Sequence, residues 1–270
     1  MIKASNSNRS IVNILGVPVI LTGIFYDFLF PYMVLVALVF CSFEYVRTIN
    51  KLNANLNVFL FLFSNLIIFL NTIINFIDVV SLLILIFISL FIIEILFLKN
   101  SSIQNIGFYI LGICWLSIFF SSSLLNIRSF DGGVYYTYLL FLSVWICDTF
   151  AFLLGRKFGK AKILPMISPN KTWFGCISGF LSNLVILISF YFINKNKLFI
   201  VDLTLFDVIV FSVIFGIFGQ IGDFAQSMIK RQAYVKDTGT ILMGHGGFFD
   251  RFDSLTFAAP LLYVYLYSIM

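Results

Sequence analysis

Residues 79–98 read VVSLLILIFISLFIIEILFL, a run of twenty residues in which Glu94 carries the only charge. A helix needs about 20 apolar residues to cross the hydrocarbon core of a bilayer, and this run meets that length. The whole chain has the same character, because 61% of its 270 residues are hydrophobic, 11% are charged and 35 are Phe. These values lie outside the averages for soluble domains, so we predict an integral membrane protein.

Eight further apolar runs, separated by short polar patches, follow the same pattern, and none shows the alternation of a strand. We predict an all-α polytopic membrane protein with about nine transmembrane helices, near residues 10–26, 28–46, 57–75, 79–98, 105–125, 133–154, 173–194, 205–228 and 254–270. Little sequence remains for a soluble domain. Residues 1–270 are therefore expected to form a single membrane domain whose first helix is retained.

The basic residues predict the orientation, because Lys and Arg of short loops stay on the cytoplasmic side. With the N-terminus inside, 14 of the 17 basic residues are cytoplasmic, and the other three are Arg128, Lys195 and Lys197. The run GRKFGKAK, residues 155–162, has a spacing suited to phosphates, but it would serve orientation equally well.

The densest polar stretch is SMIKRQAYVKDTGTILMGHGGFFDRFD, residues 227–253, which holds four basic residues, three carboxylates and the only histidine. Charge of this density beside a bilayer suggests chemistry on phosphates. Gly244, Gly246 and Gly247 flank His245, and glycines permit tight turns that expose backbone N–H groups to an anion. His245 is expected either to hydrogen-bond phosphate or to brace this loop.

Four aspartates are candidate ligands of Mg²⁺, which prefers oxygen ligands: Asp148, Asp223, Asp250 and Asp253. Asp148 and Asp223 are predicted six and five residues before the cytosolic ends of their helices, about 8 Å deep at 1.5 Å per residue. Acids at such depth usually face a polar cavity and carry function, although a salt bridge to a nearby basic residue would also account for Asp148.

Other polar residues of the apolar segments are interpreted as structural. Glu44 and Glu94 also lie near cytosolic helix ends, but neither belongs to a group of several acids and basic residues like the one at residues 223–253. The four cysteines stand alone in apolar segments without a CxxC spacing, so we expect reduced, buried thiols. With one histidine, a zinc site is not expected.

The polar stretch resembles the signature of the phosphatidate cytidylyltransferases, the CDP-diacylglycerol synthases, S-x-x-K-R-x(4)-K-D followed by H-G-G-x-x-D-R-x-D. The residues that carry this resemblance are Ser227, Lys230, Arg231, Lys236, Asp237, His245, Gly246, Gly247, Asp250, Arg251 and Asp253. A second block, residues 148–175, is similar to the D-x-x-A-[YF]…G-[RK]-x-[FG]-G…S-P-x-K-T-x-x-G segment of the family. The resemblance is close only in the C-terminal half, so helices in 131–270 are expected to be catalytic and those in 1–130 less characteristic.

Three positions depart from the family pattern: Met243 replaces a Pro or small residue, Phe174 a common Glu, and Asn170 a frequent Lys or Gly. None of them is a proposed metal ligand. Without an acid at position 174, the sequence leaves open what holds Lys171 in place.

The resemblance implies that the phosphate of phosphatidic acid attacks the α-phosphorus of CTP, giving CDP-diacylglycerol and pyrophosphate at the cytoplasmic side. It implies Mg²⁺ on Asp223, Asp250 and Asp253, with Asp148 as a further ligand, and it suggests K⁺ as a second cation. Lys171, Lys230, Arg231, Lys236 and Arg251 are expected to neutralise phosphate charge, with Asp237 and His245 also in the catalytic set and Ser227, Gly246 and Gly247 binding substrate.

Two other functions remain open at this point. An ion-coupled transporter would use Asp148 and Asp223 as intramembrane cation sites. A CTP-dependent lipid kinase would transfer the γ-phosphate and release CDP. Membrane lipids are expected partners, nucleic acid is not, and the resemblance suggests a homodimer in a bacterial-type inner membrane.

Overall fold

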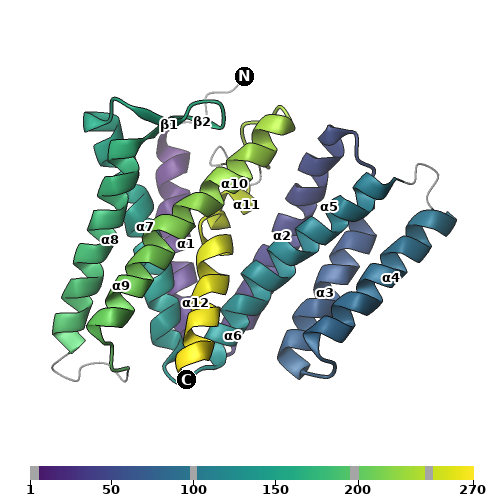
Figure 1. The fold of residues 1–270 in the computed structure, drawn as a ribbon, viewed down its shortest axis with the longest axis horizontal. Coiled ribbons are helices and arrows are strands. Elements are labelled where there is room, and N and C mark those ends of the chain that lie inside the picture. The colour runs from purple at the N-terminus through teal and green to yellow at the C-terminus, as the bar shows by residue number, and fades with distance from the viewer. Residues whose placement is uncertain (1–5, 98–101, 195–200, 241–245) are drawn as a thin grey trace. The chain divides into compact units, whose positions relative to one another are not determined.

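The computed structural model describes residues 6–97, 102–194, 201–240 and 246–270, which fold almost entirely into helices (Figure 1). The elements in chain order are α1 (Asn6–Phe25), α2 (Leu29–Ile49), η1 (Asn50–Leu52), α3 (Val58–Ile74), α4 (Val79–Phe97), α5 (Ile103–Ile113), η2 (Cys114–Ser122), α6 (Ser123–Ser129), α7 (Gly133–Phe158), β1 (Lys162–Leu164), β2 (Ser168–Thr172), α8 (Trp173–Asn194), α9 (Leu205–Val213), η3 (Ile214–Phe218), α10 (Gly219–Gln232), α11 (Phe249–Phe252) and α12 (Leu255–Ile269).

Six described helical segments are long and apolar enough to cross a membrane: Leu29–Leu52, Val79–Leu96, Ile103–Ser129, Gly133–Phe158, Trp173–Asn194 and Leu205–Gln232. Three shorter apolar helices accompany them: Gly16–Phe25, Val58–Ile74 and Leu255–Ile269. The prediction of an all-α membrane protein is confirmed at this level, since the long apolar runs do form helices. Several of the helices extend beyond the predicted bounds.

The chain divides into two compact units. The first unit comprises residues 1–125 together with 229–251, and the second comprises residues 126–228 together with 252–270. The segment 229–251, which contains most of the polar stretch, therefore belongs with the N-terminal helices. Both α10 and α11 continue from one unit into the other, because the boundaries fall within them.

Aromatic packing fills the interior of the first unit. The ring of Tyr45 on α2 stacks on Phe61 of α3 with centroids 5.2 Å apart, and its hydroxyl donates to the carbonyl of Phe108 at 2.8 Å. Bonding the hydroxyl to a backbone carbonyl removes the cost of burying it. Burial of an aromatic side chain contributes on the order of 2 kcal/mol, so this cluster helps to fix α2 against α3.

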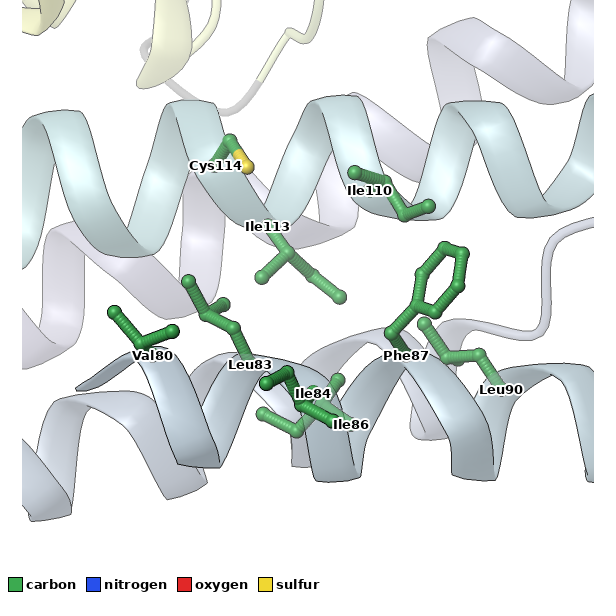
Figure 2. A pocket seen from close by; sticks show the side chains of 9 residues that line it. All are labelled: Val80, Leu83, Ile84, Ile86, Phe87, Leu90, Ile110, Ile113 and Cys114. Carbon is green, nitrogen blue, oxygen red and sulfur yellow. The ribbon is translucent and has the colours of Figure 1, made fainter. Parts of the chain in front are cut away.

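The first unit also holds an apolar hollow of about 290 Å³ between α4 and α5, shown in Figure 2. Its nine lining residues are aliphatic or aromatic apart from Cys114. Such a lining offers no group that binds phosphate, so we do not place the polar ends of a substrate there.

Glycines bring α7 and α8 of the second unit into close contact. A Cβ atom on Gly175 would come within 2.7 Å of the carbonyl oxygen of Ala151, and one on Gly179 within 2.8 Å of that of Cys147. Small residues allow backbones to approach in this way, which is common where membrane helices pack. The same packing places the carboxylate-bearing part of α7 beside the start of α8.

A short antiparallel hairpin joins these two helices, and it was not predicted from the sequence. Its strands β1 and β2 pair Lys162 with Thr172 and Leu164 with Ser168. The backbone N–H of Trp173 then donates to the carbonyl of Ala161 at 3.1 Å, where α8 begins. The hairpin therefore fixes the position of Lys171, two residues before the start of α8 at Trp173.

Candidate functional site

The second unit holds one group of predicted site residues, which we call the Lys171–Asp223 cluster: Asp148 of α7, Lys171 of β2, Asp223 and Ser227 of α10, and Asp253 with Ser254 before α12. The Nζ atom of Lys171 lies 2.5 Å from Oδ2 of Asp223. The hydroxyl of Ser227 donates to the other oxygen of Asp223 at 3.2 Å.

Lys171 is also held by an aromatic ring. Its Nζ atom lies 4.2 Å from the centroid of Phe224, the residue after its acidic partner. A cation over an aromatic face gains on the order of 1 kcal/mol. Asp223 and Phe224 together therefore hold Lys171 in place, the role that the sequence left without a residue because position 174 is not an acid. The ring of Phe174 itself packs against Phe158, with centroids 5.7 Å apart.

Asp148 and Asp253 meet at Ser254. The Ser254 hydroxyl donates to Oδ2 of Asp148 at 3.4 Å, and its backbone N–H donates to Oδ1 of Asp253 at 2.8 Å. Asp148 lies ten residues before the end of α7 and Asp223 nine before the end of α10, further than predicted because both helices continue past the predicted bounds. Their matched positions along the two helices agree with the sequence analysis.

The ion pair of the Lys171–Asp223 cluster is accessible to solvent. The side chains of Lys171 and Asp223 are 27% and 24% exposed. An ion pair with this exposure contributes only modestly to stability, because solvent screens it and the side chains lose entropy. The pair holds an ammonium group in place while leaving it open to an incoming anion.

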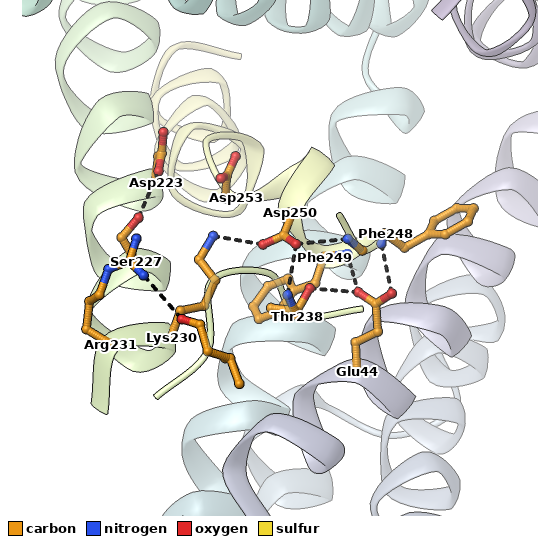
Figure 3. Close-up of polar contacts among 12 residues, drawn as sticks. Glu44, Asp223, Ser227, Lys230, Arg231, Thr238, Phe248, Phe249, Asp250 and Asp253 are labelled. Carbon is orange, nitrogen blue, oxygen red and sulfur yellow. Dashed lines mark hydrogen bonds and ion pairs between the residues drawn. The ribbon is translucent and has the colours of Figure 1, made fainter. Parts of the chain in front are cut away.

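The first unit holds a second group, the Glu44–Asp250 cluster: Glu44 of α2, Lys230 of α10, Thr238 and Gly247 from between α10 and α11, and Asp250 of α11. Figure 3 shows Glu44, Lys230, Thr238 and Asp250. Nζ of Lys230 lies 2.8 Å from Oδ1 of Asp250. The backbone N–H groups of Thr238 and Gly247 both donate to Oδ2 of Asp250 at 2.9 Å.

This second ion pair is buried, since the side chains of Lys230 and Asp250 are 10% and 7% exposed. Burial raises the pKa of Asp250, but the Lys230 ammonium and the three donated hydrogen bonds outweigh burial, so the pKa lies below its ordinary value. Asp250 is therefore charged at neutral pH and holds the backbone N–H groups of Thr238 and Gly247, which lie between α10 and α11 in the sequence.

Glu44 contacts the same part of the chain from the N-terminal half. Its Oε1 accepts from the backbone N–H of Phe248 at 3.0 Å, and its Oε2 accepts from that of Phe249 and from the Thr238 hydroxyl, both at 2.9 Å (Figure 3). From the sequence alone Glu44 is interpreted as structural, and no pattern connects it with the signature. A charged residue within an apolar 21-residue helix was the available signal.

The remaining predicted residues lie around the Glu44–Asp250 cluster or outside the described part. Lys236 and Asp237 are exposed on the loop after α10, Arg231 and Arg251 are exposed on α10 and α11, and Gly246 adopts a φ of 81° beside Asp250. His245 and Met243 lie outside the described residues.

The carboxylates do not form a preassembled metal centre. Within residues 6–97, 102–194, 201–240 and 246–270, no three His, Cys, Asp or Glu side chains gather closely enough to hold a metal ion. Asp250 is already occupied by an ammonium group and two backbone donors, and Asp223 by an ammonium group and a hydroxyl. The arrangement described here does not fit a bound Mg²⁺ without a rearrangement of these partners.

Comparison with known proteins adds a family. The profile described as "Cytidylyltransferase family" matches residues 7–269. A protein of Staphylococcus saprophyticus named phosphatidate cytidylyltransferase is 39% identical over 169 residues, which cover 62% of each chain. Proteins of the same name from Staphylococcus haemolyticus and Staphylococcus aureus (strain COL) are 43% and 44% identical over 135 and 137 residues, half of each chain. The matched region thus spans between half and 62% of the length of these relatives.

Proposed function

The chain belongs to the cytidylyltransferase family, and on this premise we propose that it transfers a cytidylyl group from CTP to phosphatidic acid in phospholipid biosynthesis. The relatives named phosphatidate cytidylyltransferase support this choice of substrates. One structural observation carries it further: Lys171 is an ammonium group held by Asp223 and Phe224 and still exposed to a phosphate. The family match does not favour a lipid kinase or a transporter.

In the proposed reaction, a phosphate oxygen of phosphatidic acid attacks the α-phosphorus of CTP. The new P–O bond forms as the bond to the bridging oxygen of the β-phosphate breaks, and pyrophosphate leaves with that bonding electron pair. Two anions must approach each other, so the step needs charge neutralisation and in-line placement more than it needs a strong base.

Lys171 is the proposed contact to the CTP phosphates, because it is fixed and accessible. Lys230, Arg231, Lys236 and Arg251 are proposed to neutralise the departing pyrophosphate and the lipid phosphate. An ammonium or guanidinium group aimed at the charge that develops in the transition state is worth several kcal/mol in similar sites. Ser227 and Gly246 are proposed substrate contacts.

The family implies a divalent metal in general, and we propose Mg²⁺, with K⁺ as a second cation. Carboxylates suit both ions, but the acids described here hold ammonium and N–H groups instead, so we assign no step to a metal. Titration of the purified protein with Mg²⁺ in the presence and absence of CTP, followed by isothermal calorimetry, tests this directly. Binding that requires CTP would agree with the absence of a preassembled centre.

We further propose the membrane arrangement predicted from the sequence: nine spans, the site facing the cytoplasm, a bacterial-type inner membrane and a homodimer. Among the described residues, six long and three shorter apolar helices support the number of spans, and the distribution of basic residues supports the cytoplasmic facing of the site. Labelling of a single cysteine placed at Lys236 from either side of sealed vesicles tests the orientation. Modification only from the cytoplasmic side is the expected result.

The reaction itself is tested by its products. Purified protein in detergent, supplied with phosphatidic acid, CTP and Mg²⁺, should form CDP-diacylglycerol and pyrophosphate in equal amounts. Mass spectrometry of the lipid and an enzymatic pyrophosphate assay measure the two. Release of CDP with a phosphorylated lipid would replace the proposal with a lipid kinase, and protein that is folded but forms no lipid product would contradict it.

A further inference from the structure

Glu44 is a buried carboxylate, and its hydrogen bonds among the described residues go to Thr238 after α10 and to Phe248 and Phe249 at the start of α11. Glu44 is 3% exposed, and its two carboxylate oxygens accept from three donors, one each from Thr238, Phe248 and Phe249. Those donors lie about 200 residues further along the chain. A buried carboxylate with three donors is well satisfied, and removing its acceptor atoms leaves buried N–H groups without a partner.

The fit between Glu44 and the loop after α10 is close enough to exclude side chains. A Cβ on Gly239 would overlap Oε1 of Glu44, and a Cβ on Gly247 would overlap Oε2. The three heavy atoms nearest to such a Cβ on Gly239 all belong to Glu44. The carboxylate thus explains why two positions of this loop are glycine.

The loop that Glu44 holds is also the loop that holds Asp250. Thr238 gives its hydroxyl to Glu44 and its backbone N–H to Asp250, and Gly247 gives its N–H to Asp250 while contacting Glu44. A shift of Glu44 would therefore move the donors that fix Asp250 and its partner Lys230.

Aromatic contacts reinforce the same connection to α2. The ring of Phe248 stacks on Phe40 with centroids 4.7 Å apart, and Phe249 lies edge-on to Tyr45 and to Trp115 at 6.4 Å and 5.8 Å. These rings supply burial, whereas the carboxylate supplies direction, because only hydrogen bonds specify the orientation of the two backbone N–H groups.

We propose that Glu44 is a positioning residue of the transfer reaction: it fixes the backbone of residues 247–250, and through it Asp250 and Lys230, in the arrangement that the reaction requires. This inference rests on the proposed function. It assigns a role in that function to a helix of the N-terminal half, which carries no part of the signature.

The test substitutes Glu44→Gln, which keeps the size of the side chain and replaces one acceptor oxygen by an NH₂ group. Whichever way the amide turns, a backbone N–H of Phe248 or Phe249 then faces a donor. The matched control is Glu94→Gln. Glu94 is also a buried acid in an apolar helix of the same unit, but it accepts from the backbone N–H of Ser102 and the side chain of Asn105.

Two readouts separate positioning from stability. Per folded molecule, we expect kcat of Glu44→Gln to fall about 10- to 100-fold, with a smaller change in KM for CTP, because a misplacement of about 1 Å can cost that much. Glu94→Gln should keep kcat near that of the wild type, because both of its described hydrogen bonds end on Oε1, which the amide oxygen can replace. Equal kcat values for the two folded variants would overturn the proposal.

Hydrogen exchange gives a readout that does not depend on activity. Exchange of the amides in a peptide covering residues 246–252 should become faster in Glu44→Gln and stay unchanged in Glu94→Gln. If wild-type protein forms no CDP-diacylglycerol, the proposed function fails, and faster exchange would then show only that Glu44 holds the loop. Unchanged exchange in Glu44→Gln would overturn the positioning role whatever the reaction.

A double-mutant cycle adds a second line of evidence. Gly239→Ala should be strongly destabilising alone, because its Cβ overlaps Glu44, and much less so in a Glu44→Ala background. Gly107→Ala serves as the control, since a Cβ there meets nothing within 4 Å. Additive costs for Gly239→Ala and Glu44→Ala would contradict the close fit on which the proposal depends.

Discussion

In the first unit, Asp250 and Glu44 are nearly buried and accept most of their hydrogen bonds from backbone N–H groups. In the second unit, the side chain of Asp223 is a quarter exposed, and its partners among the described residues are the side chains of Lys171 and Ser227. Backbone donors inside a loop cannot leave without unfolding it, but a lysine or serine side chain can turn toward a ligand. Acids of the same chemical type are therefore suited to different tasks: Asp250 and Glu44 to hold the backbone, and Asp223 to exchange partners.

The largest expected effect on activity comes from a substitution in the Lys171–Asp223 cluster. Lys171→Met removes the accessible ammonium group, and we expect kcat/KM for CTP to fall by about 10²- to 10³-fold, the loss typical for one charge-stabilising group. The melting temperature should change little, because the ion pair is partly exposed. Lys51→Met, at an exposed lysine of η1, is the control that should keep wild-type kinetics. Retained activity in Lys171→Met would remove Lys171 from the site.

Substitutions in the buried pair of Lys230 and Asp250 should lower stability strongly, unlike Lys171→Met. Asp250→Asn or Lys230→Met leaves one charge buried without its partner, at a cost of roughly 3 kcal/mol. The double variant should cost less than the two single variants together, because neither charge is then left behind. Thermal unfolding in detergent measures all three. Additive costs would mean that the pair is not coupled in the folded protein.

A pH titration sharpens the same contrast. Because the pKa of Asp250 is lowered by folding, the carboxylate contributes stability at neutral pH, and this contribution is lost as pH falls below the ordinary value of 3.8 toward the lower value of the folded state. The difference in melting temperature between wild type and Asp250→Asn should therefore be largest near pH 7 and shrink below about pH 4. A difference that stays constant down to pH 3 would contradict the lowered pKa.

The smallest expected effect concerns the ring beneath Lys171. Phe224→Leu removes the cation–π contact but keeps apolar volume, so we expect a loss of about 0.5–1 kcal/mol, or a two- to fivefold rise in KM for CTP. Steady-state kinetics at constant lipid concentration measure it. An effect as large as that of Lys171→Met would mean that the ring, and not the ion pair with Asp223, orients the lysine.

The helical membrane fold could be predicted because long apolar runs have one stable solution in a bilayer, the helix. The hairpin at residues 162–172 could not, since its short polar strands lack the alternation that marks a strand. The signature predicts which residues carry the chemistry, and these roles stay predictions; it gives no partner for Lys171, whereas the structure supplies Asp223 and Phe224. The contacts of Glu44 could not be predicted for a related reason: its partners are more than 190 residues away, and no local pattern links them.

The central claim, nucleotidyl transfer to phosphatidic acid, is tested most directly with CTP labelled separately at the α- and γ-phosphates. The purified protein is incubated with phosphatidic acid, Mg²⁺ and each nucleotide, and the label in the lipid is counted. The account predicts that α-label enters the lipid while γ-label leaves as pyrophosphate. Transfer of γ-label, or no transfer by protein shown to be folded, would contradict it.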